Sequence, residues 1–368
     1  MADEPRSAFE ESEDTRQAQI ERATNIVLAI AALGLLGGTL VGLVSPSYLL
    51  FLVSLAGMYA LLSLGLNVQW GYAGLINFSV AAFFGLGAYV PVLLSATGSP
   101  ITGAVPPIAG LFVAVVVTIL LALAIGIPTL SLREDYLAIA SLGLAEVVRL
   151  IFRNQENWTG GTSGVGGIPL FFEGVPVLGT LPREIGTVDL GIYTLGFQFW
   201  NGLMNALIVG SFVLVSYLVL RRVHRSPWGR VLRTIRSDED LAEALGKNTY
   251  AFRMQAFVLG SVVTMLAGVY YAYSNYFLTP DIFDPIFTFY AWIAVILGGS
   301  GSNRGALFGG VVIVTIIEGT RQLGLSASWR LFAVGLLIIL VMRFRPQGVL
   351  PPRDELIWPG ARRGGTDE

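Results

Sequence analysis

Long apolar stretches dominate the chain and are separated by short polar or Gly- and Pro-containing segments. Ten of them approach or exceed the roughly 20 residues that a helix needs to cross a hydrocarbon core about 30 Å thick. They cover residues 24–44, 48–66, 74–97, 105–130, 135–153, 196–220, 251–275, 285–299, 305–323 and 327–342. The pattern predicts about ten transmembrane helices, of which the short stretch 285–299 could be a partial or tilted crossing.

Composition agrees with a protein that lies in a lipid bilayer. Hydrophobic residues make up 54% of the chain and charged residues 13%, against about 25% charged residues in soluble domains. The chain has no Cys and a single His, His224, which argues against a disulfide framework and against a zinc or haem site. We therefore expect an all-α integral membrane protein without a metal site and without a nucleic-acid partner.

The basic residues predict the orientation of the helices, because Lys and Arg accumulate in short cytoplasmic loops. With a cytoplasmic N-terminus and an even number of spans, the C-terminus is cytoplasmic too. Most arginines then lie on the cytoplasmic side: Arg133, Arg221, Arg222, Arg225, Arg230, Arg233, Arg236, Arg304, Arg343, Arg345, Arg353, Arg362 and Arg363. The main exceptions are Arg153 and Arg183. We expect a multi-pass protein of the cell membrane with both termini in the cytoplasm.

This topology divides the chain into parts. Residues 1–23 are acidic and polar and lack the basic start of a signal peptide, so they form a cytoplasmic tail. Residues 24–343 form the membrane domain, with an extracytoplasmic loop at 154–195 and a cytoplasmic charged segment at 221–250. Residues 344–368 form a second cytoplasmic tail.

The extracytoplasmic loop begins with the Gly-rich stretch TGGTSGVGGIP, which is not a phosphate-binding loop. A Walker A motif requires Gly-Lys followed by Ser or Thr, and the only Lys of the chain, Lys247, is followed by Asn248. The sequence therefore contains no Walker A motif for ATP.

One segment inside the membrane domain, GRVLRTIRSDEDLAEALGKN at 229–248, is densely charged. Ser237 can cap a helix, with Asp238 in its positive first turn, and Gly246 can close it in a left-handed conformation. Leu241 and Leu245 share one face of that helix. The segment is either a solvated loop whose arginines anchor the topology or a docking helix that inserts into a groove of a soluble partner.

The charged segment and the TYAFRMQAFVLGS that follows resemble the coupling segment of permease subunits in ABC importers for branched-chain amino acids. Four further stretches extend the resemblance: LGLNVQWGYAGLINFSVAAFFGLGAYV, YLAIASLGLAEVVRLIFRNQENWTGGTSGVGGIP, ILGGSGSNRGALFGG and RFRPQGVLP. The second stretch and the RPQG tail are similar to the LivM-type subunit, not to its LivH-type companion. The broader importer signature consists of Glu-Ala-Ala, a distant Gly and a late Ile-x-Leu-Pro. This chain matches only part of it, at Glu243, Ala244 and Gly246.

The resemblance implies an ABC importer permease with a type II-like architecture that moves branched-chain or similar small amino acids inward. It is not an enzyme and holds no cofactor of its own, because two separate ATP-binding subunits bind and hydrolyse ATP. A LivH-type permease subunit and an extracytoplasmic substrate-binding protein complete the system. The residues of the ATPase-coupling segment are Arg230, Arg233, Arg236, Ser237, Asp238, Leu241, Glu243, Leu245 and Gly246. Similar permeases also serve urea and short amides, so the substrate stays open.

Two pairs of polar residues are candidates for the translocation path. Asn67 and Asn77 flank a Gly-rich break, where they serve either as loop and cap residues or as part of an interrupted helix that meets the substrate. Glu146 and Arg149 lie three residues apart on one helix face. A lone charge inside the membrane costs about 2.5–3.5 kcal/mol on insertion scales, so this pair faces protein or water. It either neutralises a subunit contact or lines the path.

A different class of transporter remains an alternative. An ion-coupled secondary transporter could use Glu146 or Glu318 as its protonatable site. The densely charged segment argues against this alternative, because such a transporter needs no docking site for an ATPase.

Overall fold

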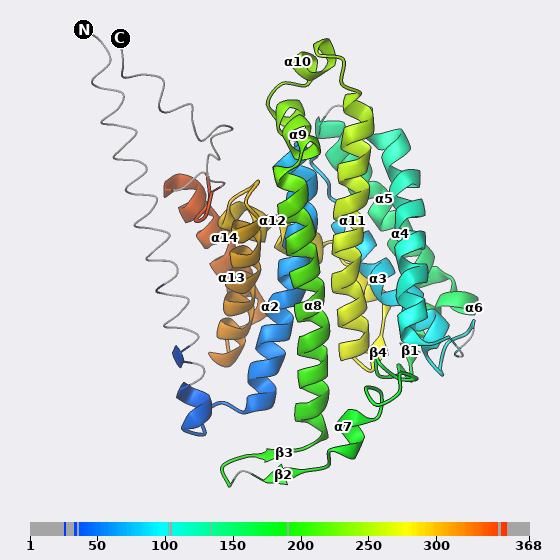
Figure 1. Cartoon of the computed structure of the whole chain (residues 1–368), viewed down its shortest axis with the longest axis vertical. Coiled ribbons are helices and arrows are strands. Elements are labelled where there is room, and N and C mark those ends of the chain that lie inside the picture. Colours follow the sequence, from blue (N-terminus) through cyan, green and yellow to red (C-terminus); the bar gives the residue numbers. More distant parts are fainter. Residues whose placement is uncertain are drawn as a thin grey trace.

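The computed structural model describes residues 26, 33–34, 37–101, 103, 105–132, 134–189, 191–344 and 347–351. The predicted tail 1–23, residues 24–25, 27–32 and 35–36 of the predicted first span 24–44, Arg133 and most of the predicted tail 344–368 lie outside the described residues. The described chain is a bundle of helices, most of which run along one long axis (Figure 1).

The helices of the bundle fall on the predicted apolar stretches from residue 48 onward. They are α2 (Pro46–Leu66), α3 (Val80–Ser95), α4 (Pro107–Thr129), α5 (Glu134–Asn154), α8 (Phe197–Arg225), α11 (Thr249–Ser274), α12 (Ile286–Gly298), α13 (Asn303–Gln322) and α14 (Ala327–Phe344). Among the described residues, four helical segments are long and apolar enough to cross a membrane: Pro46–Tyr72, Pro107–Thr129, Phe197–Arg225 and Thr249–Ser274. Two shorter apolar helices, α3 and α12, accompany them. The fold is a multi-pass helical bundle, and the count of ten crossings stays a prediction.

The predicted span 74–97 is wrong in its first part. The helix α2 continues into a π-helical turn, η1 (Asn67–Tyr72), and the chain then runs without helical structure to Ser79. Gly74 adopts a φ of 72°, which favours glycine. The Asn77 side-chain oxygen accepts hydrogen bonds from the backbone N–H of Ser79 at 2.8 Å and from its hydroxyl at 2.6 Å. These local bonds compete with helical backbone bonds and delay the start of α3 to Val80.

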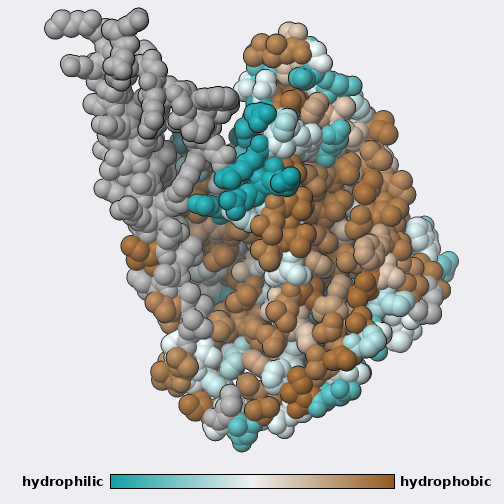
Figure 2. Space-filling view, in the orientation of Figure 1, coloured by the Kyte–Doolittle hydropathy of each residue, from teal (hydrophilic) through white to brown (hydrophobic). Residues whose placement is uncertain are grey.

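Glycines bring the central helices into close contact. A Cβ atom at Gly268 of α11 would overlap the carbonyl oxygen of Phe84 in α3, and one at Gly309 of α13 would overlap that of Ala294 in α12. Close backbone approach through small residues is a common way of packing helices in membranes. Helices α4, α8 and α14 instead expose many large apolar side chains. Figure 2 shows a broad hydrophobic surface over the middle of the bundle, in the region of α8 and α4, which suits contact with lipid.

The two ends of the bundle differ. One end, here called the α9 end, carries two short helices, α9 (Pro227–Ser237) and α10 (Glu239–Ala244), at the top of Figure 1. The opposite end, here called the loop end, carries the long connection between α5 and α8, with helices α6 (Glu156–Thr159), η2 (Gly161–Ser163) and α7 (Leu181–Glu184).

Short strands at the loop end modify the expectation of an all-α fold. Strand β1 (Val165–Gly166) pairs antiparallel with β4 (Phe277–Leu278), which is followed by the 3-10 turn η3 (Pro280–Phe283). Strand β2 (Val188–Asp189) pairs antiparallel with β3 (Thr194–Leu195). The first pair ties the loop to the segment that follows α11.

Candidate coupling and translocation site

The caps of α10 differ from the predicted ones. Asp238 caps the helix, because its carboxylate accepts a hydrogen bond from the backbone N–H of Leu241 at 2.9 Å. Ser237 is the last residue of α9, and its hydroxyl donates to the carbonyl oxygen of Thr234 at 2.9 Å. The prediction that Ser237 caps the helix is therefore wrong. Gly246 has a φ of 73° and closes the segment in the predicted left-handed conformation.

The short helix α10 presents an apolar surface at the tip of the bundle. Its Ala242 is buried, whereas Leu241 is 50% exposed and Leu245, just after the helix, is 64% exposed. Figure 2 shows this hydrophobic tip above the hydrophilic surface of the α9 end. Two exposed leucines on so small an element suit a partner that covers them.

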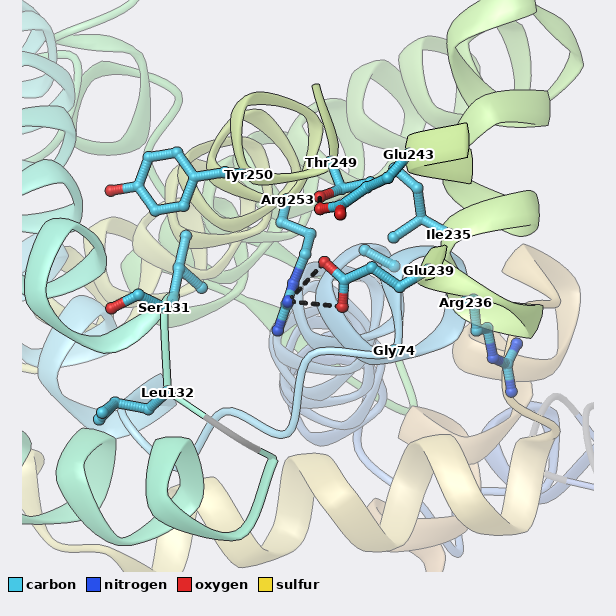
Figure 3. Close-up of a pocket in the computed structure, with 12 residues that line it drawn as sticks. Gly74, Ser131, Leu132, Ile235, Arg236, Glu239, Glu243, Thr249, Tyr250 and Arg253 are labelled. Carbon is cyan, nitrogen blue, oxygen red and sulfur yellow. Dashed lines mark hydrogen bonds and ion pairs between the residues drawn. The ribbon is translucent and has the colours of Figure 1, made fainter. Parts of the chain in front are cut away.

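Two polar contacts attach α10 to the start of α11. The Arg253 Nη1 atom donates to both carboxylate oxygens of Glu239 at 2.9 Å, as the dashed lines in Figure 3 show. The Thr249 hydroxyl donates to Glu243 Oε1 at 2.8 Å. Both carboxylates lie near the N-terminus of α11, where the helix dipole also favours negative charge. The apolar tip is thus attached to a long helix of the bundle.

A cavity of about 500 Å³ separates this attachment from the turn between α4 and α5. Tyr250, Ser131 and Leu132 lie on one side of it, and Glu239 and Glu243 lie on the other (Figure 3). The remaining lining residues are Ala73, Gly74, Leu130, Ile235, Arg236, Thr249 and Arg253. The cavity therefore lies between α10 and the α4–α5 turn.

The predicted coupling arginines have different surroundings. Arg230 is exposed, and Arg233 donates to the carbonyl oxygen of His224 at 3.1 Å. Arg236 points away from the Arg253–Glu239 pair in Figure 3 and toward the bundle. Its Nη1 donates to the carbonyl oxygen of Gly71 at 2.5 Å, and its Nη2 donates to the Ser300 hydroxyl at 3.1 Å.

The environment of Arg236 keeps its charge next to the bundle. Partial burial lowers the pKa of its guanidinium below the ordinary value. An arginine nevertheless stays protonated at neutral pH, since the ordinary pKa of a guanidinium lies far above neutrality. A permanent charge therefore contacts the backbone of the π-helical turn.

Polar side chains fill the interior around that turn. Asn67 is buried, accepts a hydrogen bond from the backbone N–H of Gly301 at 2.7 Å and donates to Asn303 Oδ1 at 3.2 Å. The Tyr72 hydroxyl donates to the same Asn303 oxygen at 2.5 Å. These bonds attach the broken end of α2 to the loop before α13.

A second set of bonds attaches the turn to α11. Buried Gln69 donates to the carbonyl oxygen of Phe257 at 2.9 Å and to the Ser261 hydroxyl at 3.2 Å. Buried Asn77 donates to Gln69 Oε1 at 2.7 Å, and its own carbonyl accepts from Trp292 Nε1 at 3.0 Å. Asn67 and Asn77 thus both have hydrogen-bond partners inside the protein, and in the sequence they flank Gln69. Gln69 was missed at the level of sequence, although it stands between them in the same apolar stretch.

The predicted pair on α5 forms. Arg149 Nη1 lies 3.2 Å from Glu146 Oε1, and Arg149 Nη2 lies 3.9 Å from Asp284 Oδ2. The side chain of Glu146 is 41% exposed and that of Asp284 is 46% exposed. The group lies in the last turns of α5, toward the loop end. Asp284 was missed because only the fold brings it to α5.

Glu318, the other candidate for ion coupling, is almost fully buried near the loop end of α13. The hydroxyl of Tyr48 donates to its Oε2 at 3.1 Å, and Arg321 Nη1 lies 3.5 Å from its Oε1. Both of its carboxylate oxygens therefore have partners on the protein.

Comparison with known proteins identifies the family. Residues 48–342 match the family described as "Branched-chain amino acid transport system / permease component". The chain belongs to this permease family. No solved structure matches the permease significantly.

Named relatives of the permease narrow the type. It is 30% identical over 308 residues to the high-affinity branched-chain amino acid transport system permease protein LivM of Salmonella typhimurium, covering 80% of this chain and 68% of that protein. It is 27% identical over 339 residues to the probable LivM protein of Methanocaldococcus jannaschii, covering 81% and 91%. The LivH protein of Escherichia coli is 26% identical over 305 residues, covering 81% and 92%. The permease is therefore of the LivM type, and the predicted resemblance is confirmed.

Proposed function

We propose that this permease is the LivM-type membrane subunit of an ABC importer that carries branched-chain amino acids into the cell. Separate ATP-binding subunits dock on α9 and α10, and ATP hydrolysis there drives the helices of the bundle. The exposure of Leu241 and Leu245 is the observation that carries the docking proposal. A six-residue helix is marginal alone, yet this one is fastened to α11 and presents its leucines outward.

The distribution of basic residues supports a cytoplasmic location of the α9 end. Arg221, Arg222, Arg225, Arg230, Arg233, Arg236, Arg304 and Arg343 lie at that end of the described chain. The loop end carries fewer, although Arg321 and Arg330 join the expected exceptions Arg153 and Arg183. By the positive-inside rule the loop end is extracytoplasmic, and the C-terminus that follows α14 is cytoplasmic. Reporter fusions at Asp240 and after Gly166 test this orientation, and a periplasm-type signal at Asp240 contradicts it.

The proposed assembly has further members. A LivH-type permease subunit pairs with this chain, two ATP-binding subunits occupy the cytoplasmic side, and a substrate-binding protein delivers the amino acid to the loop end. The partly exposed group of Glu146, Arg149 and Asp284 supports such a partner. Charges on a membrane helix need protein or water around them, and the interface of two permease subunits provides either.

Purification of the complex from cells that express all subunits tests ATPase docking. We expect Leu241→Asp with Leu245→Asp to abolish copurification of the ATP-binding subunits and ATP-driven uptake, while the permease stays in the membrane. Leu323→Asp with Leu325→Asp is the matched control, because it makes the same change at two exposed leucines of the loop end. Copurification that survives the first pair of substitutions would contradict docking on α10.

Uptake by proteoliposomes separates the proposed function from its alternatives. We expect uptake of radiolabelled leucine to require ATP and the binding protein, and to resist a protonophore. Uptake driven by a proton gradient without ATP would identify an ion-coupled transporter. The full partnering of Glu318 supports the ATP-driven reading, since its carboxylate has a structural role. ATP-driven uptake of urea or short amides that leucine does not inhibit would show that the substrate is not a branched-chain amino acid.

A further inference from the structure

The arginine nearest to α10 connects two parts of the bundle. Arg236 lies in the last turn of α9, and only Ser237 and Asp238 separate it from the first residue of α10. One side of its guanidinium donates to the Gly71 carbonyl in η1, and the other donates to the Ser300 hydroxyl in the loop between α12 and α13. A displacement of α10 therefore acts on Arg236 directly.

The backbone that Arg236 contacts is closely packed. A Cβ atom at Gly71 would overlap the Asn67 side chain and the backbone nitrogen of Gly301, so η1 fits tightly against the α12–α13 loop. The same turn carries Gln69, which bonds to Phe257 and Ser261 of α11. A shift of Gly71 would therefore also displace α11 and the loop that precedes α13.

We propose that Arg236 is a positioning residue that transmits movement of α9 and α10 to the π-helical turn at the end of α2. This assignment gives Arg236 a role in addition to any contact with an ATPase, and it rests on the proposed docking of an ATPase on α10. The geometry suits arginine better than lysine. Its planar fork reaches two acceptors at once, whereas the compact ammonium of lysine does not match two acceptors held in that arrangement.

Purification and reconstitution of the complete complex test the role of Arg236, with Arg236→Gln and Arg236→Lys as variants. Arg230→Gln is the matched control, because it removes the same charge from another exposed position of the same helix and leaves the Arg236 bonds to Gly71 and Ser300 in place. Membrane abundance, copurification of the ATP-binding subunits, ATP hydrolysis and leucine uptake are all measured. The decisive quantity is leucine taken up per ATP hydrolysed, which a purely structural defect does not change.

We expect Arg236→Gln to keep the ATP-binding subunits and ATP hydrolysis, while uptake per ATP falls by about tenfold, the scale of one lost charge-assisted hydrogen bond. Arg236→Lys shows a smaller loss in the same direction, and Arg230→Gln keeps the wild-type ratio. Ser300→Ala removes only the second acceptor and lowers the ratio moderately. If Arg236→Gln does not reach the membrane, Arg236→Lys and Ser300→Ala test the inference in its place. An unchanged ratio of leucine taken up to ATP hydrolysed in both of these variants overturns the inference.

Other outcomes separate this inference from the proposed function. If Arg236→Gln loses the ATP-binding subunits in step with uptake, Arg236 is a docking residue and the inference fails while ATPase docking stands. If Arg236→Gln lowers the ratio no more than Arg230→Gln does, the inference also fails. If the wild-type complex contains no ATP-binding subunit, the proposed function fails, and the inference fails with it.

Discussion

Arg253 and Glu239 form the polar attachment between the apolar tip of the permease and its helical bundle. The guanidinium Nη1 lies 2.9 Å from both carboxylate oxygens, and the arginine side chain is only 13% exposed. Because Arg253 lies in the first two turns of the long helix α11, force on α10 reaches α11 through this pair.

Loss of the Arg253–Glu239 pair should loosen α10. We expect Glu239→Gln to destabilise the protein by roughly 1–2 kcal/mol, less than the 3–5 kcal/mol of a fully buried pair, because the glutamate is 41% exposed. The apparent Tm of the purified protein should fall, and ATPase copurification should weaken. Asp240→Asn is the control, since Asp240 is an exposed acid of the same short helix. Equal effects of the two substitutions would show that only the charge of α10 matters.

The group on α5 should respond unequally to removal of its members. Arg149→Gln leaves two carboxylates, those of Glu146 and Asp284, without their shared cation, whereas Glu146→Gln leaves Arg149 with Asp284. We therefore expect Arg149→Gln to reduce membrane abundance or uptake more strongly than Glu146→Gln does. Normal abundance and uptake in both variants would mean that water surrounds the group.

Charge reversal tests whether Asp284 belongs to this group. Glu146→Arg with Arg149→Glu would place a carboxylate at position 149, next to Asp284, and like charges repel. We expect this double variant to restore abundance only when Asp284→Asn is added. Full recovery of membrane abundance by the double variant alone would show that Asp284 does not interact with the residue at position 149. Abundance that recovers while uptake does not would assign the charges to the translocation path.

The contact between α3 and α11 should not tolerate a methyl group. Gly268→Ala forces the Cβ atom into the Phe84 carbonyl, a backbone atom that cannot rotate away. We expect a loss of about 1–3 kcal/mol, the usual scale of overpacking, measured as a lower yield of folded protein and a lower apparent Tm. Gly210→Ala is the control, because a Cβ atom at Gly210 of α8 meets open space. A similar loss in both variants would contradict close packing as the cause.

The buried bonds of η1 make a further prediction. Gln69→Leu keeps the approximate size of the side chain but leaves the Nδ2 atom of Asn77 without the acceptor it has now. A buried polar group without a partner costs about 1–3 kcal/mol. We expect reduced folded protein, whereas Gln198→Leu, at an exposed position of α8, should be neutral in detergent. Normal stability of Gln69→Leu would indicate that water replaces the lost bonds.

Local features of the chain predicted most of the elements. Long apolar stretches correspond to α2, α4, α8 and α11, because apolar length is a property of consecutive residues. The left-handed conformation of Gly246 was also predicted, because it depends on a glycine directly after a short helix. The segment after Gly74 was mistaken for helix, because hydropathy does not distinguish a buried non-helical segment from a buried helix. Side-chain bonds of Asn77 stabilise that segment, and they appear only in the folded chain.

The sequence by itself determined the bilayer as solvent, the family, the dense charge of residues 229–248 and the pair on α5, since each depends on composition or on residues one helical turn apart. Only the tertiary structure decided that Arg236 contacts Gly71, that Asp284 joins Arg149, and that Gln69 links α2 to α11. These contacts join residues more than one hundred positions apart in the chain. The path of the helices brings them together, and that path depends on which glycine-lined faces pack against each other throughout the bundle.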